Sequence, residues 1–106
     1  GSLTMDIDRY AEWAARIPVG TPAIEDDVEL LSYLCLGLSS EAGEIADLMK
    51  KRLRDGRWNP DAAADELGDL AYYFARLCAA VGKRPSEILD RSLAKIEQRI
   101  AESKRP

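Results

Sequence analysis

The sequence predicts an all-α protein, a small bundle of about four helices that oligomerisation completes. Leu, Ala, Glu, Arg and Lys dominate the composition, which favours helix over sheet. Apolar residues recur at helical spacing in segments that prolines and glycines separate. The length of 106 residues predicts one domain, residues 1–106, with 1–5 as a tag remnant or disordered start. A domain this small leaves much of its surface unburied, so self-association is expected to add stability.

The first two helices have recognisable ends. Thr4 or Asp6 is a suitable N-cap for a short first helix, which ends near Ile17. Residues 18–23 contain two prolines and a glycine and are predicted to form a loop. A long second helix is expected from about 25 to 54, because acids occupy its first turn and bases its last, as the helix dipole favours.

The third and fourth helices begin at prolines. Asn59 is the predicted cap of the third helix, with Pro60 at its first position and Gly82 after its end. Pro85 opens the fourth helix, which continues to about Glu102. The short connections after the second and third helices predict antiparallel neighbours. The fourth helix carries an apolar stripe of Leu89, Leu93, Ile96 and Ile100.

Charge and hydropathy exclude several classes of protein. The net charge of −4 provides no basic field for a nucleic acid. The sequence shows neither an apolar run of about 20 residues for a membrane span nor a signal peptide, so a cytoplasmic protein is expected. Cys35 and Cys78 lie in apolar helical stretches and are predicted to be small buried residues in a reducing compartment.

Two acidic pairs occupy unusual places on the second and third helices. At about 100° per residue, Glu41 falls at the centre of the apolar stripe of its helix, and Glu44 about 60° to one side. Glu66 is likewise central on the third helix, and Asp69 is offset to the same side by about 60°. If the two stripes face each other, four carboxylates meet in a mostly apolar cleft.

Four carboxylates in one cleft require a positive partner. Unpaired acids are costly to bury and repel one another, and a divalent cation is the simplest counter-charge. The chain contains no histidine, which excludes the Glu-x-x-His di-iron pattern and ordinary zinc sites. Oxygen ligands alone indicate Mg²⁺, with Mn²⁺ as a substitute. Mid-helix glycines at 37, 43 and 68 indicate either room for a ligand or close packing of helices.

These motifs resemble a known family. Residues 36–45, LGLSSEAGEI, and 65–73, DELGDLAYY, are similar to the MazG-type nucleoside triphosphate pyrophosphohydrolases of the all-α NTP pyrophosphatase superfamily. The resemblance extends from about Tyr10 to Arg99. It implies hydrolysis of a (deoxy)nucleoside triphosphate to the monophosphate and pyrophosphate, and assembly as a homodimer or homotetramer with sites near subunit contacts.

The resemblance also implies which residues act. Mg²⁺ would be bound by the residues at Glu41, Glu44, Glu66 and Asp69. Ser40 stands where the family often has a further Glu, which leaves open the number of metal ions and the catalytic base. Glu41 and Glu44 are the two candidates for that base.

The triphosphate needs cations and the nucleobase needs a stacking partner. Lys51 and Arg54 are the best phosphate candidates in the basic end of the second helix, although helix C-termini favour bases in any case. Lys95 and Arg99 match a basic segment near the end of the family pattern. Trp58, expected in an exposed loop, is a candidate to stack on a base. Tyr73, Tyr72 and Trp13 are further candidates, and Tyr73 and Trp13 fit the core better than the site.

Two other functions fit the same residues. A related pyrophosphatase would act on dCTP, dUTP or phosphoribosyl-ATP. A non-catalytic helical assembly or cation-binding module would instead pair its acids with Arg76, Arg84 or Arg91 of a partner chain, or with a metal ion, without turnover.

Overall fold

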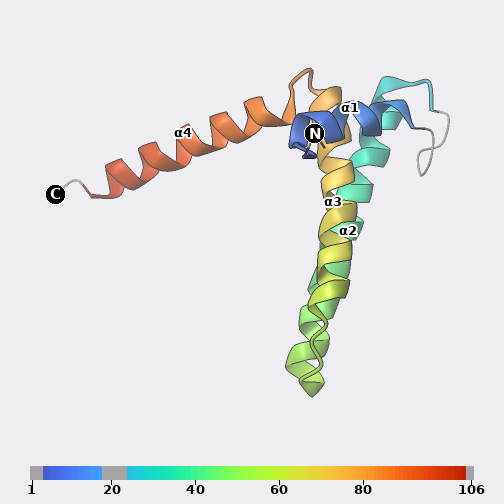
Figure 1. Ribbon diagram of the computed structural model, residues 1–106, viewed down its shortest axis with the longest axis vertical. Coiled ribbons are helices and arrows are strands. Elements are labelled where there is room, and N and C mark those ends of the chain that lie inside the picture. The colour runs from blue at the N-terminus through green and yellow to red at the C-terminus, as the bar shows by residue number, and fades with distance from the viewer. Residues whose placement is uncertain (1–3, 18–23, 105–106) are drawn as a thin grey trace.

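The computed structural model describes residues 4–17 and 24–104 and contains four α-helices, with no strand among these residues (Figure 1). The predicted all-α fold is therefore confirmed. The expected loop at 18–23 and the first three residues lie outside the described residues. The helices are α1 (Ile7–Arg16), α2 (Asp27–Asp55), α3 (Pro60–Ala80) and α4 (Pro85–Ser103).

Side-chain caps and glycines set the helix ends close to the predicted positions. Asp6, Asp26 and Asn59 each accept a hydrogen bond from the backbone N–H three residues later, at 2.8–3.1 Å. Asp6 is thus the cap of α1, and α2 starts two residues after the predicted position. Gly56 and Gly82 follow α2 and α3 with φ of 77° and 73°, a left-handed conformation that glycine adopts without strain.

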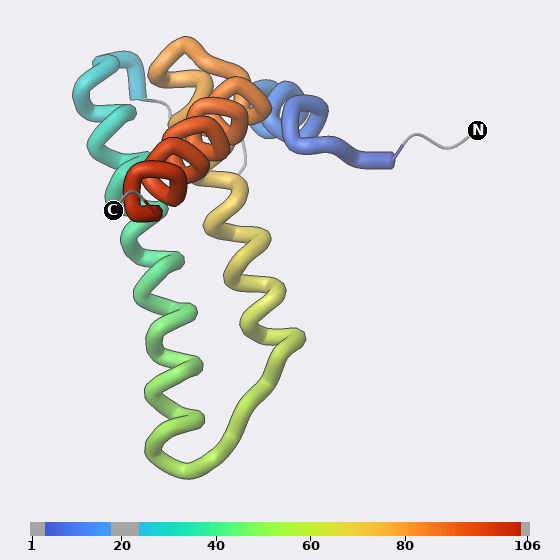
Figure 2. The backbone as a smooth tube through the Cα atoms, turned by 90° about the vertical axis from the view of Figure 1, so that its left-hand side faces the viewer, coloured from blue at the N-terminus to red at the C-terminus, as the bar shows by residue number. Residues whose placement is uncertain are grey.

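The helices α2 and α3 form a long antiparallel hairpin, which Figure 2 shows from the side. Their apolar stripes face each other, which meets the condition for the carboxylates to meet, and Leu34 of α2 is almost completely buried. Gly37 allows the Tyr73 ring to pack directly against α2, since a Cβ at this position would overlap the ring. Cys78 is buried as predicted. The same prediction for Cys35 is wrong, because this residue lies on the side of α2 that faces away from α3.

The direction of α4 differs from the prediction. Instead of returning along α3, α4 projects away from the hairpin (Figure 1). The cause is a contact between distant parts of the chain: Asp8 of α1 accepts hydrogen bonds from the Ser86 backbone N–H at 2.9 Å and from its hydroxyl at 2.6 Å. This contact fixes the first turn of α4 to α1. The apolar stripe of α4 therefore has no cover within the described residues and is about half exposed.

The chain is more extended than a compact domain of its size. Its radius of gyration is 17.0 Å, whereas about 13 Å is typical of a compact chain of this length. Its accessible surface is 8058 Å², against about 5,900 Å² for a monomeric protein of this mass. Most of the large apolar side chains that are exposed lie on α2 and α4. No helix among the described residues is both long and apolar enough to cross a membrane.

Candidate functional site

Three of the four predicted acidic ligands come together between α2 and α3. Glu41 of α2 and Glu66 and Asp69 of α3 each offer a carboxylate oxygen, and these oxygens lie within 4.8 Å of one another. The helical wheel predicted this meeting, because Glu41 and Glu66 are central on the two apolar stripes that pack together. We call these three residues the carboxylate cluster.

The cluster has an unfavourable charge distribution without a cation. A hydrogen bond with Glu66, partial burial and the negative charges of Asp69, Glu66 and Glu44 raise the pKa of Glu41 from 4.5 to about 7. No Lys or Arg in the described part of the chain forms an ion pair with a cluster carboxylate. Three oxygen donors without a protein cation fit a hard divalent metal ion.

Glu44 lies outside the carboxylate cluster, although its charge acts on Glu41. It is exposed and follows Glu41 by almost one turn of α2. Glu41 and Glu66, which are central on their apolar stripes, are half-buried, whereas Glu44 and Asp69, which are offset from the centre, are exposed. Both exposed acids were predicted to be offset to the same side, yet only Asp69 points its carboxylate into the cluster.

An aromatic pocket of about 290 Å³ opens beside the carboxylate cluster. Glu41 and Asp69 form one part of its wall. Trp13 is exposed at this pocket, so the expectation that it belongs to the core is wrong. The remaining lining residues come from α1, its C-terminal flank and α3, and are Tyr10, Ile17, Tyr72 and Tyr73.

The sequence analysis did not assign Tyr10 and Ile17 to a site. Their spacing with Trp13 places all three on one face of α1, which is the signal that could have grouped them. Tyr10 and Trp13 lie with ring centroids 5.6 Å apart. Desolvation raises the pKa of Tyr10 and of Tyr73, so both hydroxyls remain protonated at neutral pH and can donate hydrogen bonds.

Arg76 fixes the aromatic wall to α1. Its guanidinium donates to the Ala14 carbonyl oxygen at 3.4 Å and to the Tyr72 hydroxyl at 3.1 Å. The same guanidinium lies 5.9 Å from the centroid of the Tyr72 ring. Tyr72 in turn makes an edge-to-face contact with Tyr73, with centroids 5.3 Å apart. The pocket wall is therefore held by polar contacts as well as by packing.

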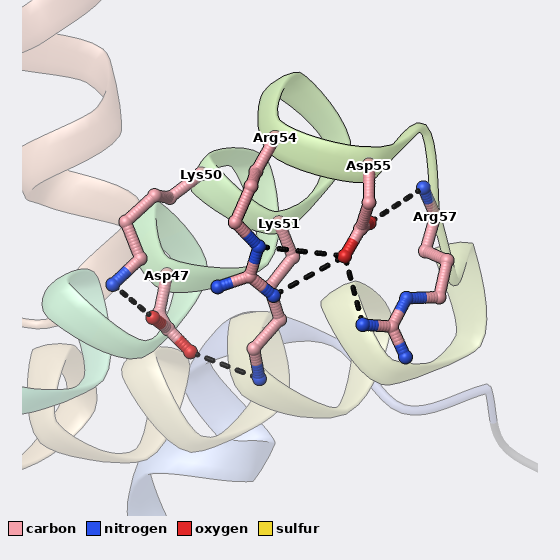
Figure 3. A network of polar contacts seen from close by, with 6 residues as sticks. All are labelled: Asp47, Lys50, Lys51, Arg54, Asp55 and Arg57. Carbon is pink, nitrogen blue, oxygen red and sulfur yellow. Dashed lines mark hydrogen bonds and ion pairs between the residues drawn. The ribbon is translucent and has the colours of Figure 1, made fainter.

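Two of the predicted phosphate cations, Lys51 and Arg54, lie in the last turns of α2 among acidic and basic neighbours (Figure 3). Asp47 forms ion pairs with Lys50 and Lys51, with 3.1 Å between each lysine Nζ and a carboxylate oxygen. Asp55 pairs with Arg54 at 3.2 Å and with Arg57 at 2.8 Å. These are exposed ion pairs, which an incoming anion can replace at little cost.

A second pocket of about 470 Å³, at the tip of the hairpin that α2 and α3 form, is lined in part by Lys51, Arg57 and Trp58. Trp58 is exposed as predicted, but it belongs to this tip pocket and not to the aromatic pocket. Lys51 follows Glu41 by ten residues, or about 15 Å along the helix axis. Lys95 and Arg99 lie exposed on α4, and the chain does not bring them to the cluster.

Comparison with known proteins finds a related phage protein. No model of a known protein family matches the sequence, and no solved structure matches it. Gene 37 protein of Mycobacterium phage L5 is 40% identical over 79 residues, which cover 70% of this chain and 69% of that protein. The chain belongs to the same family as Gene 37 protein of this phage.

Proposed function

We propose that the protein is a Mg²⁺-dependent, MazG-type nucleoside triphosphate pyrophosphohydrolase, which cleaves a (deoxy)nucleoside triphosphate to the monophosphate and pyrophosphate. The observation that carries this proposal is the carboxylate cluster at the wall of the aromatic pocket. Metal ligands and a stacking surface for a nucleobase are thereby adjacent, as a metal-bound nucleotide requires. Removal of aberrant nucleotides from the cytoplasmic pool is the role we assign to this reaction.

In this proposal the carboxylate cluster holds the metal. Glu41, Glu66 and Asp69 supply its protein ligands, and Mn²⁺ would serve in place of Mg²⁺. A bound divalent ion supplies charge neutralisation at the phosphates and a more acidic water. Glu44 remains outside the cluster, one turn away, and accepts the proton of the attacking water in our proposal. Glu41, the other candidate for the catalytic base in the sequence analysis, then serves as a metal ligand.

The order of groups along the hairpin matches the order of groups in a nucleotide. The aromatic pocket lies towards α1, the carboxylate cluster lies in the middle, and Lys51 and Arg54 lie towards the tip. A base in the aromatic pocket would place its phosphates at the cluster, with the terminal phosphates directed towards these cations. Attack at the α-phosphorus then releases pyrophosphate on the cationic side.

Self-association belongs to the same proposal. Lys95 and Arg99 lie on α4, which projects away from the hairpin (Figure 1), so they would reach a nucleotide only from a neighbouring copy. The excess exposed surface favours such a homodimer or homotetramer.

The decisive test is a substrate panel with Mg²⁺ that contains all common NTPs and dNTPs together with phosphoribosyl-ATP. Pyrophosphate and orthophosphate are scored separately, and dCTP or dUTP preference is read from the same panel. Glu66→Gln is expected to abolish pyrophosphate release, whereas the matched change Glu97→Gln on exposed α4 is expected to leave it unchanged. Release of orthophosphate alone, or full activity of Glu66→Gln, would show that the proposal is wrong. A protein that binds Mg²⁺ without any turnover would be the non-catalytic module.

A further inference from the structure

The pocket of about 470 Å³ at the tip of the hairpin shares no lining residue with the aromatic pocket beside the carboxylate cluster. We call it the tip pocket. Its volume falls in the range of about 300–1,000 Å³ that is typical of small-molecule sites. Its lining residues come from the last turns of α2, the loop after it and the first residue of α3, and are Leu48, Lys51, Arg57, Trp58, Asn59 and Pro60.

Trp58 gives the tip pocket a flat aromatic surface. This residue is 40% exposed, so packing against the rest of the hairpin uses only part of its indole. Leu48 and Pro60 add apolar atoms to the same wall. A partly exposed indole beside apolar atoms is a surface on which a planar heterocycle can stack.

Two cations line the tip pocket together with this indole. They are Lys51 and Arg57, and the described residues that line the tip pocket include no carboxylate. Both cations form ion pairs at the surface: Lys51 Nζ lies 3.1 Å from an Asp47 oxygen, and an Arg57 nitrogen lies 2.8 Å from an Asp55 oxygen (Figure 3). Exposed ion pairs contribute little to stability, so an anion can replace the acid as the partner. Asp55 would keep Arg54 as its partner, at 3.2 Å.

The charge around the tip pocket is opposite in sign to that of the whole chain. Residues 47–61 contain five basic and three acidic side chains, so this segment carries a net charge of +2. The chain as a whole carries −4. A local positive potential on a negative protein directs anions to this end of the hairpin.

We propose that the tip pocket binds a nucleoside monophosphate, with its base on Trp58 and its phosphate at Arg57 and Lys51. A phosphate monoester carries close to two negative charges at neutral pH, which two cations can match. The lining residues supply this positive charge themselves, so binding needs no metal ion. Because no metal-ligating carboxylate lines the tip pocket, the nucleotide is held there without being hydrolysed.

The tip pocket differs from the site that the proposed function assigns to the substrate. Lys51 follows Glu41 by ten residues, or about 15 Å along the helix axis, and Trp58 lies in the loop after α2. Lys51 has a place in both proposals, whereas Arg57 and Trp58 have a role only in this one. The proposal therefore does not rest on the proposed enzyme, and its test uses Arg57 and Trp58.

Tryptophan fluorescence can be read from each pocket separately. The chain contains two tryptophans, of which Trp13 lines the aromatic pocket and Trp58 the tip pocket. Trp13→Phe therefore leaves Trp58 as the reporter. In EDTA, adenosine monophosphate is expected to quench the fluorescence of this variant to saturation. Adenosine, which lacks the phosphate, is expected to bind about tenfold more weakly.

Arg57→Ala in the Trp13→Phe background tests the phosphate contact. It is expected to weaken binding of adenosine monophosphate by about tenfold, because it removes a charge-assisted hydrogen bond. Arg84→Ala is the matched control and is expected to leave binding unchanged. The Arg84 side chain is 71% exposed and pairs with an acid on α4, and that of Arg57 is 78% exposed. No quenching, an equal affinity for adenosine, or an unchanged affinity in Arg57→Ala would each refute the proposal.

Nuclear magnetic resonance of the wild type provides a second measurement on the unaltered chain. Its two indole N–H signals are assigned by comparison with Trp13→Phe and Trp58→Phe. Adenosine monophosphate in EDTA is expected to shift the Trp58 signal. A shift of the Trp13 signal alone would place the nucleotide in the aromatic pocket and overturn the proposal. Neither measurement uses a metal ion or turnover, so each can succeed or fail independently of the proposed enzyme.

Discussion

Replacing Glu41 by Gln is expected to stabilise the metal-free protein above neutral pH. The pKa of Glu41 is raised from 4.5 to about 7, so the folded state holds a proton that the unfolded state has released between these values. This stabilising contribution is complete below about pH 4.5 and is lost as pH rises through 7. At about 1.4 kcal/mol per pKa unit the loss is at most about 3 kcal/mol. Because Glu41 is only half-buried and solvent screens its charge, we expect about 1–2 kcal/mol.

Urea unfolding in the presence of EDTA at a series of pH values measures this loss. As pH rises from 4.5 to above 7, the free energy of unfolding of the wild type is expected to fall by about 1–2 kcal/mol relative to that of Glu41→Gln. Glu97→Gln, on the exposed face of α4, corrects for the general effect of an amide. Millimolar Mg²⁺ is expected to restore the wild type above pH 7 and to leave Glu41→Gln nearly unchanged. Parallel pH profiles of wild type and Glu41→Gln in EDTA would refute this account of the carboxylate cluster.

Two further predictions concern packing and the position of α4. Gly37→Ala is expected to lower the free energy of unfolding by about 1–3 kcal/mol, because the new methyl group meets the Tyr73 ring. Gly68→Ala meets no atom and is expected to raise the free energy of unfolding by up to about 1 kcal/mol. Denaturation midpoints of both variants test this, and equal midpoints would contradict it. Asp8→Ala is expected to speed hydrogen exchange in the first turn of α4, since it removes both bonds to Ser86. Because those bonds lower the pKa of Asp8, the same protection in the wild type should be lost as pH falls below 3.8, and unchanged exchange in either experiment would contradict the assigned contact.

Local signals made the helices predictable. A cap such as Asp6 or Asn59 and a terminator such as Gly82 act within a few residues of themselves, and the structure uses all three. The carboxylate cluster was predictable for a related reason. Helical periodicity places Glu41 and Glu66 on the apolar stripes, and those stripes can be buried only against each other.

The remaining features depend on contacts between distant segments. The direction of α4 follows from the bond between Asp8 and Ser86, residues 78 positions apart, for which neither local sequence contains a signal. Trp13 lies at a pocket and not in the core, a position that depends on the packing of α1 against α3, two segments far apart in the sequence. The helical wheel gives Glu44 and Asp69 the same offset from their stripes. Only Asp69 reaches the carboxylate cluster, because this depends on how α2 and α3 pack together and not on the position within one helix.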